Sequence, residues 1–334
     1  MRKFNIPIFV PHKGCPYDCV FCNQKRITGN LKETMPDDVT DTIEEYLKTL
    51  PETDRNIEVA FFGGSFTGIP IEEQSALMHR VEPYIKSGEI DGIRLSTRPD
   101  YITDEILANL KNYGVTTIEL GVQSMVDDVL KASNRGHTSQ DVCNAVKLIR
   151  SYGFSLGLQM MTGLPGDTDE HSIETAKRII ALKPDFVRIY PTLTIKDTYL
   201  EKMYHKGEYK PQTLTEAVEL SKELLLMFED AGVGVIRIGL QPTDEINEDA
   251  SVVAGPFHSS FGELVESAIY YDIIADTVSG LTGDVTVYVN PKEVSKATGN
   301  KRANIIKIKE KTGINIKIAT DCSLKRREVR YTCF

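Results

Sequence analysis

The sequence contains no run of about 18 apolar residues, so nothing in it predicts a membrane-spanning helix. The apolar stretch near its start is too short for the core of a secretory signal, and no small-residue cleavage site follows it. Low-complexity tracts and repeats of fixed length are also absent. These absences predict a soluble, cytoplasmic protein that has no membrane partner.

Cysteine is scarce, with 6 in 334 residues. Three of the six, Cys15, Cys19 and Cys22, fall within eight positions, a spacing that does not suit a disulfide framework. We therefore interpret these three cysteines as metal ligands in a reducing compartment.

Charge is distributed unevenly along the chain. The net charge is -9, yet residues 284–334 hold 12 Lys and Arg against 5 Asp and Glu. The acidic remainder argues against a surface that binds nucleic acid over most of its area. The basic terminal segment is either a nucleic-acid-binding surface or a solvated tail.

Short runs rich in β-branched and aromatic residues alternate with amphipathic stretches, as expected for repeated βα units. Such repetition favours an α/β fold with a partial or complete parallel βα barrel; the alternative is an open doubly wound sheet. In a barrel, functional residues follow the strands. The expected strands are residues 6–10, 57–62, 92–97, 116–120, 154–161, 186–190 and 233–238, and the expected helices are 36–50, 71–85, 103–113, 139–152 and 168–182.

The last third of the chain has a different pattern. Residues 213–231 predict one long helix, residues 241–257 are polar with Pro and Gly, and residues 284–320 have the order strand, helix, turn, helix, strand. We predict a barrel domain over 1–240, a linker and helical bridge over 241–283, and a small basic α+β domain over 284–334.

The stretch GCPYDCVFC carries the strongest chemical signal. Three closely spaced thiolates can bind three irons of one [4Fe-4S] cluster and leave the fourth iron open to an outside ligand. The alternative is a structural zinc site with His12 as fourth ligand, but the second Cys-x-x-Cys pair of a zinc ribbon is missing.

The C-x-x-x-C-x-x-C pattern, with Phe21 before its last cysteine at the end of a first strand, resembles the radical S-adenosylmethionine (SAM) superfamily. Over roughly residues 5–240 the chain resembles more narrowly the radical domain of the Elongator subunit 3 family of tRNA-modifying enzymes. The stretches that carry this resemblance are GGSFTGIP, STRPDYI, IELGVQSMVDDVLKASNRGHT, MMTGLPGDT, RIYPTLTIKDT and KGEYKPQT.

The resemblance implies a [4Fe-4S] cluster held by Cys15, Cys19 and Cys22, with SAM bound at its open iron. It implies reductive cleavage of SAM to a 5′-deoxyadenosyl radical that abstracts hydrogen from the substrate. It assigns no side chain as a catalytic acid or base. By the same resemblance, the residues around SAM are Tyr17, Phe21, Gly63, Gly64, Ser96, Gln123, Arg135 and Gln159.

Several of these positions have a purely structural alternative. The glycine pair 63–64 also suits a tight βα turn, Arg135 also suits a solvated helix, and Phe21 also suits core packing. Ser96 departs from the family, which has Glu before TRPD; serine is shorter and carries no charge.

The segment from residue 284 has the βααβ order of a KH module, an RNA-binding fold. Its short loop reads GNKR, so Arg302 replaces the second glycine of the usual G-x-x-G. We expect Gly299, Lys301 and Arg302 to contact RNA; the alternative is that the unit packs on the barrel and its lysines stay solvated. The chain lacks the acetyl-CoA pattern of the Elongator relatives, so their carboxymethylation of wobble uridine is not carried over.

We therefore predict a radical SAM enzyme that modifies RNA, either tRNA or rRNA, with reduced ferredoxin or flavodoxin as electron donor and with no DNA partner. One alternative is a small-molecule or porphyrin-type substrate, as in the coproporphyrinogen dehydrogenase branch. Another is a non-catalytic iron-sulfur RNA-binding redox sensor. Cys322 and Cys333 flank basic residues and could bind metal, form a reactive pair or have no function.

Overall fold

The computed structural model describes residues 2–10, 19–23, 34–241, 247 and 250–333. Two compact units make up the chain: Met1–Gln212 with Met227–Phe257, and Thr213–Leu226 with His258–Phe334. The predicted domain boundaries stay a prediction. No helix within these described ranges is long and apolar enough to cross a membrane.

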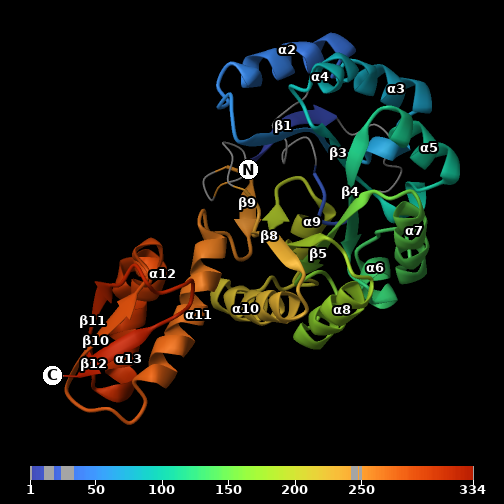
Figure 1. Cartoon of the computed structure of the whole chain (residues 1–334). Coiled ribbons are helices and arrows are strands. Elements are labelled where there is room, and N and C mark those ends of the chain that lie inside the picture. Colours follow the sequence, from blue (N-terminus) through green and yellow to red (C-terminus); the bar gives the residue numbers. More distant parts are fainter. Residues whose placement is uncertain (1, 11–18, 24–33, 242–246, 248–249, 334) are drawn as a thin grey trace. The chain divides into compact units, whose positions relative to one another are not determined.

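The first unit is built on a seven-stranded sheet in the order β1-β2-β3-β4-β5-β6-β8, in which every neighbouring pair is parallel (Figure 1). All seven strands coincide with runs predicted from the sequence. The strands are β1 (Arg2–Val10), β2 (Arg55–Gly63), β3 (Gly92–Thr97), β4 (Val115–Gln123), β5 (Ser155–Thr162), β6 (Phe186–Pro191) and β8 (Gly234–Ile238).

Contacts across this sheet show that it is strongly curved. The guanidinium carbon of Arg188 on β6 lies 5.9 Å from the ring centre of Phe62 on β2, although three strands separate β2 from β6. In a flat sheet those strands would be about 19 Å apart, at roughly 4.8 Å per step. The sheet is therefore a half-barrel, which confirms the predicted partial βα barrel.

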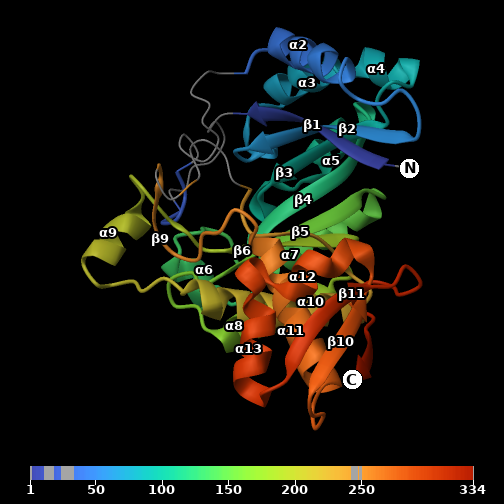
Figure 2. The ribbon, with the colours of Figure 1, turned by 90° about the vertical axis from the view of Figure 1, so that its left-hand side faces the viewer.

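Amphipathic helices follow the strands and cover the outer face of the half-barrel, as Figure 2 shows for α2, α3 and α4 beside β1 and β2. The predicted helix over 71–85 is two helices, because Pro83 at the start of the second lacks the amide hydrogen that an unbroken helix would require. The covering helices are α2 (Pro36–Leu47), α3 (Ile71–His79), α4 (Glu82–Ser87), α5 (Asp104–Asn112), α7 (Ser139–Ser151) and α8 (Asp169–Ala181).

Among the described residues of this unit, two short α-helices and one pair of short strands were not expected from the sequence. They are α6 (Asp127–Ala132), α9 (Tyr199–His205), and the antiparallel pair β7 (Thr194–Ile195) and β9 (Val252–Ala254). Each is too short to show a clear periodicity.

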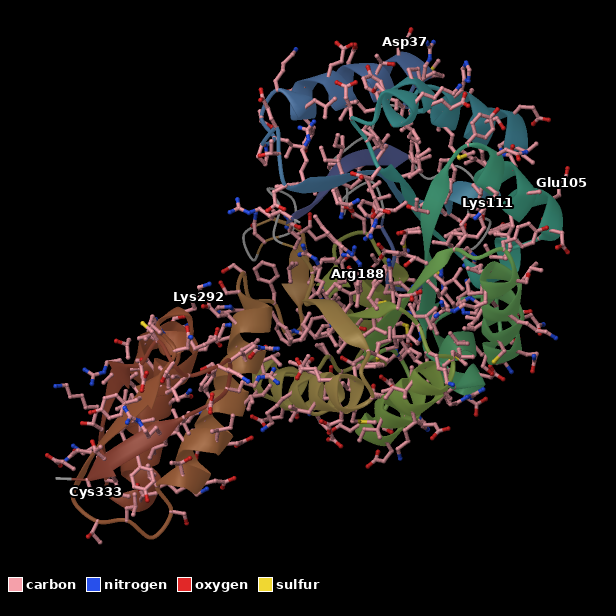
Figure 3. The ribbon with its side chains drawn as sticks, in the orientation of Figure 1. Asp37, Glu105, Lys111, Arg188, Lys292 and Cys333 are labelled. Carbon is pink, nitrogen blue, oxygen red and sulfur yellow. The ribbon has the colours of Figure 1, made fainter. Side chains whose placement is uncertain are left out.

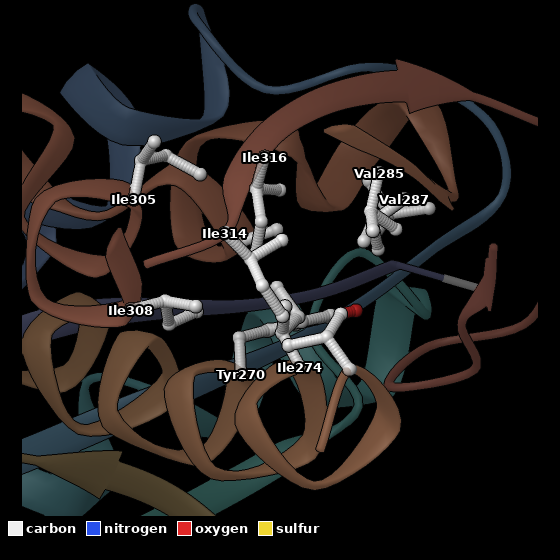
Figure 4. Packing of buried hydrophobic residues seen from close by; sticks show 11 residues of the cluster. Tyr270, Ile274, Val285, Val287, Ile305, Ile308, Ile314 and Ile316 are labelled. Atoms are coloured by element: carbon white, nitrogen blue, oxygen red, sulfur yellow. The ribbon is translucent and has the colours of Figure 1, made fainter. Parts of the chain in front are cut away.

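The second unit has a mixed sheet in the order β11-β10-β12, with β10 (Asp284–Val289) parallel to β11 (Asn315–Thr320) and antiparallel to β12 (Arg330–Cys333). The predicted βααβ order is present, and β12 is an addition. Tyr270 and Ile274 of α11 pack into the same core as Val285 and Val287 of β10 (Figure 4). Its helices are α11 (Phe261–Thr277), α12 (Val294–Thr298), α13 (Ala303–Thr312) and part of α10 (Leu214–Asp230).

Gly157 of β5 offers a test of the packing inside the half-barrel, because a methyl group there would overlap the ring of Phe186. We expect Gly157→Ala to lower the free energy of unfolding by about 1–3 kcal/mol, since overpacking forces side chains out of their preferred rotamers. Gly234→Ala is the matched control: its methyl group would meet nothing closer than 3.9 Å, and we expect a change within about 0.5 kcal/mol. Urea denaturation of both variants measures the difference, and equal losses would contradict the packing described.

Candidate active site

Residues 19–23, here called the cysteine segment, lie at the carboxyl ends of the parallel strands. Main-chain hydrogen bonds hold it on two sides: Val20 N donates to Ser133 O at 3.1 Å, and Leu200 N donates to Val20 O at 2.7 Å. Cys19 is buried and Cys22 is half-buried, and Cys22 N donates to Cys19 O in a tight turn. Cys15, Tyr17 and the alternative zinc ligand His12 lie outside the described residues.

Phe21 is half-buried and packs against a small apolar cluster made of Val20, Leu200, Met203 and Tyr209. The core-packing interpretation of Phe21 therefore accounts for part of its surface. A contact with the adenine of SAM stays a prediction.

Arg135 is 7% exposed, so the alternative of a solvated arginine is wrong. Its Nη2 donates to the carbonyl of Gly121 at 2.8 Å, and its Nη1 lies 3.5 Å from the sulfur of Cys19. Arg98 holds the main chain at this point through a hydrogen bond from Nη2 to the carbonyl of Arg135. The structure thus brings two of the predicted site residues, Arg135 and Cys19, into direct contact.

The donor set around Cys19 fits a thiolate-bound iron-sulfur cluster. Two thiols stand three positions apart on one turn, and a buried guanidinium lies beside one of them. Arg135 Nε is buried and has no hydrogen-bond partner within the described ranges. A buried cation with a spare donor favours anionic groups at this place, such as metal-bound thiolates and a carboxylate.

Gly121 was not singled out from the sequence, yet the site depends on it. A Cβ atom there would lie 2.8 Å from both Arg135 Nη2 and Gln123 Nε2. Gln123 itself has φ of 64°, a left-handed conformation that is rare outside glycine and concentrated at functional sites. The role of Gly121 could have been inferred from the sequence, because this glycine stands at a strand end two residues before Gln123.

The glycine pair ends β2. Gly63 has φ of 111°, and a Cβ atom there would lie 2.5 Å from the carbonyl of Val10, while Gly64 N donates to that same carbonyl at 3.1 Å. Gly63 is thus required by the close approach of β1. Contact of the pair with the amino group of SAM stays a prediction.

Five polar side chains on the inner face of the half-barrel form one hydrogen-bonded group, here called the interior network: Glu58, Arg94, Glu119, Gln159 and Arg188. The carboxylate of Glu119 is fully buried and accepts hydrogen bonds from Arg94, from Gln159 and, through two nitrogens, from Arg188. Arg94 also pairs with Glu58 at 2.8 Å. Figure 3 shows Arg188 inside the curve of strands, with Asp37 and Glu105 on outer helices.

The interior network reaches one further predicted residue. Gln159 Nε2 lies 3.4 Å from Ser96 Oγ, which places both side chains on the inner face near the strand ends. Sequence reasoning singled out Gln159 and Ser96, but gave Glu119 no role. The role of Glu119 could have been inferred because it is a lone Glu in an apolar strand, and a charge in such a position requires buried partners.

The residues predicted to bind RNA, Gly299, Lys301 and Arg302, belong to the second compact unit. Gly299 is fixed by a close approach, since a Cβ atom there would lie 2.9 Å from Asn304 N. Lys301 and Arg302 are exposed and have φ of 50° and 63°. The position where G-x-x-G has its second glycine is therefore left-handed here too, although it holds an arginine.

Cys322 and Cys333 do not form a common site. Cys333 on β12 pairs with Val285 near the start of β10, whereas Asp321, next to Cys322, bonds to Val289 at the end of β10. Four residues of extended strand separate those levels by about 13 Å. No group of three or more potential metal ligands is present among the residues that the structure describes.

His137 lies next to this site and is 4% exposed. Its Nε2 lies 3.2 Å from the carbonyl of Val122, and its Nδ1 is buried without a partner in the described part of the chain. Burial, together with the positive charges of Arg135 and Arg98, lowers the pKa of His137 from 6.5 to about 4. The imidazole is therefore neutral at pH 7, and its Nε2 hydrogen donates to Val122.

This low pKa makes stability depend on pH. The unfolded imidazole binds a proton near pH 6.5 and the folded one near pH 4, so the stability present at neutral pH falls as the pH drops through this window. We expect the wild-type protein, prepared without a cluster, to lose about 2 kcal/mol more than His137→Gln between pH 7 and pH 5. Glutamine retains an N–H donor for Val122. Urea denaturation at the two pH values measures this, and parallel losses in both proteins would overturn the assignment.

Two family models match the chain. The radical SAM superfamily matches residues 9–179, and the radical SAM C-terminal domain matches residues 184–271. The first match covers slightly more than half of the chain and includes the cysteine segment, Gln123 and Arg135.

Relatives of established name are similar over the same region. Human Elongator complex protein 3 is 32% identical over 203 residues, which are 55% of this chain and 37% of the human protein. The tRNA uridine(34) acetyltransferase of Methanocaldococcus infernus is 31% identical over 198 residues, 53% of this chain and 37% of that protein. The chain thus spans little more than a third of the length of these curated relatives.

Solved structures agree with the fold. The archaeal Elp3 of Methanocaldococcus infernus has a TM-score of 0.64 at 26% identity, covering 80% of this chain and 63% of that chain. Coproporphyrinogen III oxidase of Escherichia coli has a TM-score of 0.50 at 19% identity over 67% of this chain and 52% of that chain, a likeness of fold alone. The chain belongs to the radical SAM superfamily, whose cofactors are a [4Fe-4S] cluster and S-adenosylmethionine.

Proposed function

We propose that this radical SAM enzyme modifies RNA, with tRNA as the favoured class and rRNA as the other. The observation that carries the proposal is the similarity over 203 residues to Elongator complex protein 3, together with that to an archaeal tRNA uridine(34) acetyltransferase. Because each relative is nearly three times as long as the matched region, the group installed is not carried over.

When bound, the reduced cluster and SAM supply a 5′-deoxyadenosyl radical that abstracts hydrogen from the substrate. The protein provides the binding site, orientation and exclusion of water. We propose that Cys15, Cys19 and Cys22 are the cluster ligands. Arg135, held between Cys19 and Gly121, is positioned to bind the carboxylate of SAM.

The remaining contacts with SAM follow from the strand ends. Gly64 is half-buried, and we propose that its main chain contacts the amino group and that Gln123 contributes its amide. Gln159 lies beside Ser96, so we propose that its amide supplies the polar contact that the shorter serine does not reach. Tyr17 and Phe21 are proposed to shield the cluster and the adenine. We propose reduced ferredoxin or flavodoxin as the electron donor.

The second unit supports an RNA substrate through its charge and its loop. Residues 284–334 have a net charge of +7 by sequence, and in the loop between two helices Lys301 and Arg302 are exposed while Gly299 is buried. We propose that this loop contacts the RNA backbone. Phosphate contacts by Lys and Arg supply most of the sequence-independent affinity for nucleic acids.

Replacing Arg135 tests the SAM site. Loss of a charge-assisted, two-pronged contact costs about 1.5–3 kcal/mol, so we expect Arg135→Ala to weaken SAM binding roughly 10- to 100-fold. Arg135→Lys keeps the positive charge but loses the two-nitrogen geometry of the guanidinium. Its affinity for SAM should lie between those of the wild type and Arg135→Ala. Lys131→Ala, an exposed change on the same helix–loop segment, is the matched control. Equilibrium dialysis of labelled SAM with anaerobically reconstituted protein gives the affinities, and unchanged binding in Arg135→Ala would show that Arg135 has another role.

The RNA proposal is tested first by mass spectrometry of nucleosides from cells with and without the gene. We expect one modified nucleoside to disappear without the gene, and to form when reconstituted protein, SAM and reductant are added to RNA from the deletion strain. Identical nucleoside profiles in both strains, with 5′-deoxyadenosine still formed, would favour a small-molecule or porphyrin-type substrate. Lack of 5′-deoxyadenosine under all conditions would favour a non-catalytic redox sensor.

The basic loop is tested by binding. We expect Lys301→Glu/Arg302→Glu to weaken binding to total tRNA and to reduce the slope of log K against log salt by about 2, one for each lost phosphate contact. Removing residues 284–334 would expose Tyr270 and Ile274 of the shared core, so substitution is the cleaner test. Lys147→Glu/Lys177→Glu, on exposed faces of α7 and α8, makes the same change in net charge as the matched control. Equal losses in both double variants would mean that the loop has no specific role.

A further inference from the structure

Two aromatic side chains lie on the inner face of the half-barrel near the strand ends. Phe62 of β2 faces inward, because its ring lies under the guanidinium of Arg188. Phe9 of β1 pairs in register with Phe62 and so lies on the same face, where it is 38% exposed. Phe9 is thus the exposed ring, and Phe62 beside it is half-buried. Such an aromatic pair suits a flat ring, since stacking on aromatic side chains is how proteins bind unpaired bases.

Hydrogen-bond donors lie on the opposite strands, β6 and β8. Arg188 is neutralised by Glu119, to which it is bound through two nitrogens. Arg94 and Glu58 neutralise each other in the same way, so the interior network has no net charge. A further cation on this face would therefore be uncompensated.

Arg237 of β8 is that cation. Val187 of β6 pairs with Val235, but Arg188 pairs with Arg237, so the register shifts by one residue at Ile236. Without this bulge Arg237 would point to the outer face, since side chains alternate along a strand. With it, Arg237 lies beside Arg188 on the inner face, half-buried and with no ion pair or hydrogen bond to any described residue.

Tyr190 adds a neutral donor two residues after Arg188 on β6. Its oxygen lies 3.4 Å from Arg188 Nη1, from which it accepts, so its own hydrogen is available to an incoming acceptor. Burial raises the pKa of Tyr190, and Arg237 is close enough to act on it electrostatically. The hydroxyl is therefore protonated at neutral pH.

We propose that the inner face of the half-barrel binds one nucleotide of the substrate, with its base against Phe9 and Phe62 and its phosphate against Arg237 and Tyr190. This rests on the proposed RNA substrate and names the part of it that enters the barrel. The nucleotide must leave the base stack, because the target of a radical formed inside a barrel has to reach that radical. An aromatic surface facing an uncompensated cation matches a flat ring joined to an anion.

The test uses reconstituted protein with SAM and the four ribonucleoside 5′-monophosphates, each compared with its nucleoside by equilibrium dialysis. We expect at least one monophosphate to bind more tightly than its nucleoside. Arg237→Gln should weaken that monophosphate about 10- to 100-fold and leave the nucleoside unchanged. Phe62→Leu should weaken both by about 10- to 100-fold, whereas Phe62→Tyr, which keeps a ring, should retain most of the binding.

Lys177→Gln is the matched control, since it removes one positive charge from the exposed outer face of α8. Arg237 has no hydrogen bond to a described residue, so Arg237→Gln should keep the iron content and unfolding midpoint of the wild type. The site is overturned if no monophosphate binds more tightly than its nucleoside, or if Arg237→Gln and Lys177→Gln behave alike. If the gene-dependent nucleoside still forms in that case, the RNA proposal stands and only this site fails. If a porphyrin carboxylate binds in a way that depends on Arg237 and no nucleotide binds, both the nucleotide site and the RNA proposal are overturned.

Discussion

The fully buried carboxylate of Glu119 is the constraint on which the half-barrel depends. A carboxylate without solvent must be compensated, and Glu119 is compensated by Arg94 of β3, Arg188 of β6 and Gln159 of β5. Removing one partner of such a group leaves a buried charge unpaired, at a cost of about 3–5 kcal/mol. The group thus links β4 to its two neighbours, β3 and β5, and to β6 beyond them.

The same network determines what the inner face can offer to a ligand. Because Glu119 neutralises Arg188, the guanidinium of Arg188 supports Tyr190 and lies over Phe62 instead of attracting an anion. Arg237 adds to this face a positive charge that no described residue pairs. A nearly neutral network beside such a cation can orient an anionic ligand without holding every anion tightly.

The sequence alone was sufficient for the seven strands of the half-barrel, because buried parallel strands appear as short apolar runs between turn residues. It was also sufficient for the family, since the cysteine spacing and strand-end motifs are specific. It could not supply the burial of Arg135, because the contacts with Cys19 and Gly121 join residues far apart along the chain. The inward position of Arg237 was equally hidden, since a bulge reverses the alternation on which such a prediction depends.

The main-chain hydrogen bonds of the cysteine segment would couple a cluster bound at the proposed cysteine ligands to the stability of the fold. Val20 bonds to Ser133 in the loop after α6 and to Leu200 in α9, so this segment joins parts of the chain that are distant in sequence. A ligand that binds the thiols of Cys19 and Cys22 only when the chain is folded stabilises the folded state by mass action. It thereby stabilises the cysteine segment, the loop after α6 and α9 together. Iron supply would then govern how much of this protein persists in a cell as well as how much of it is active.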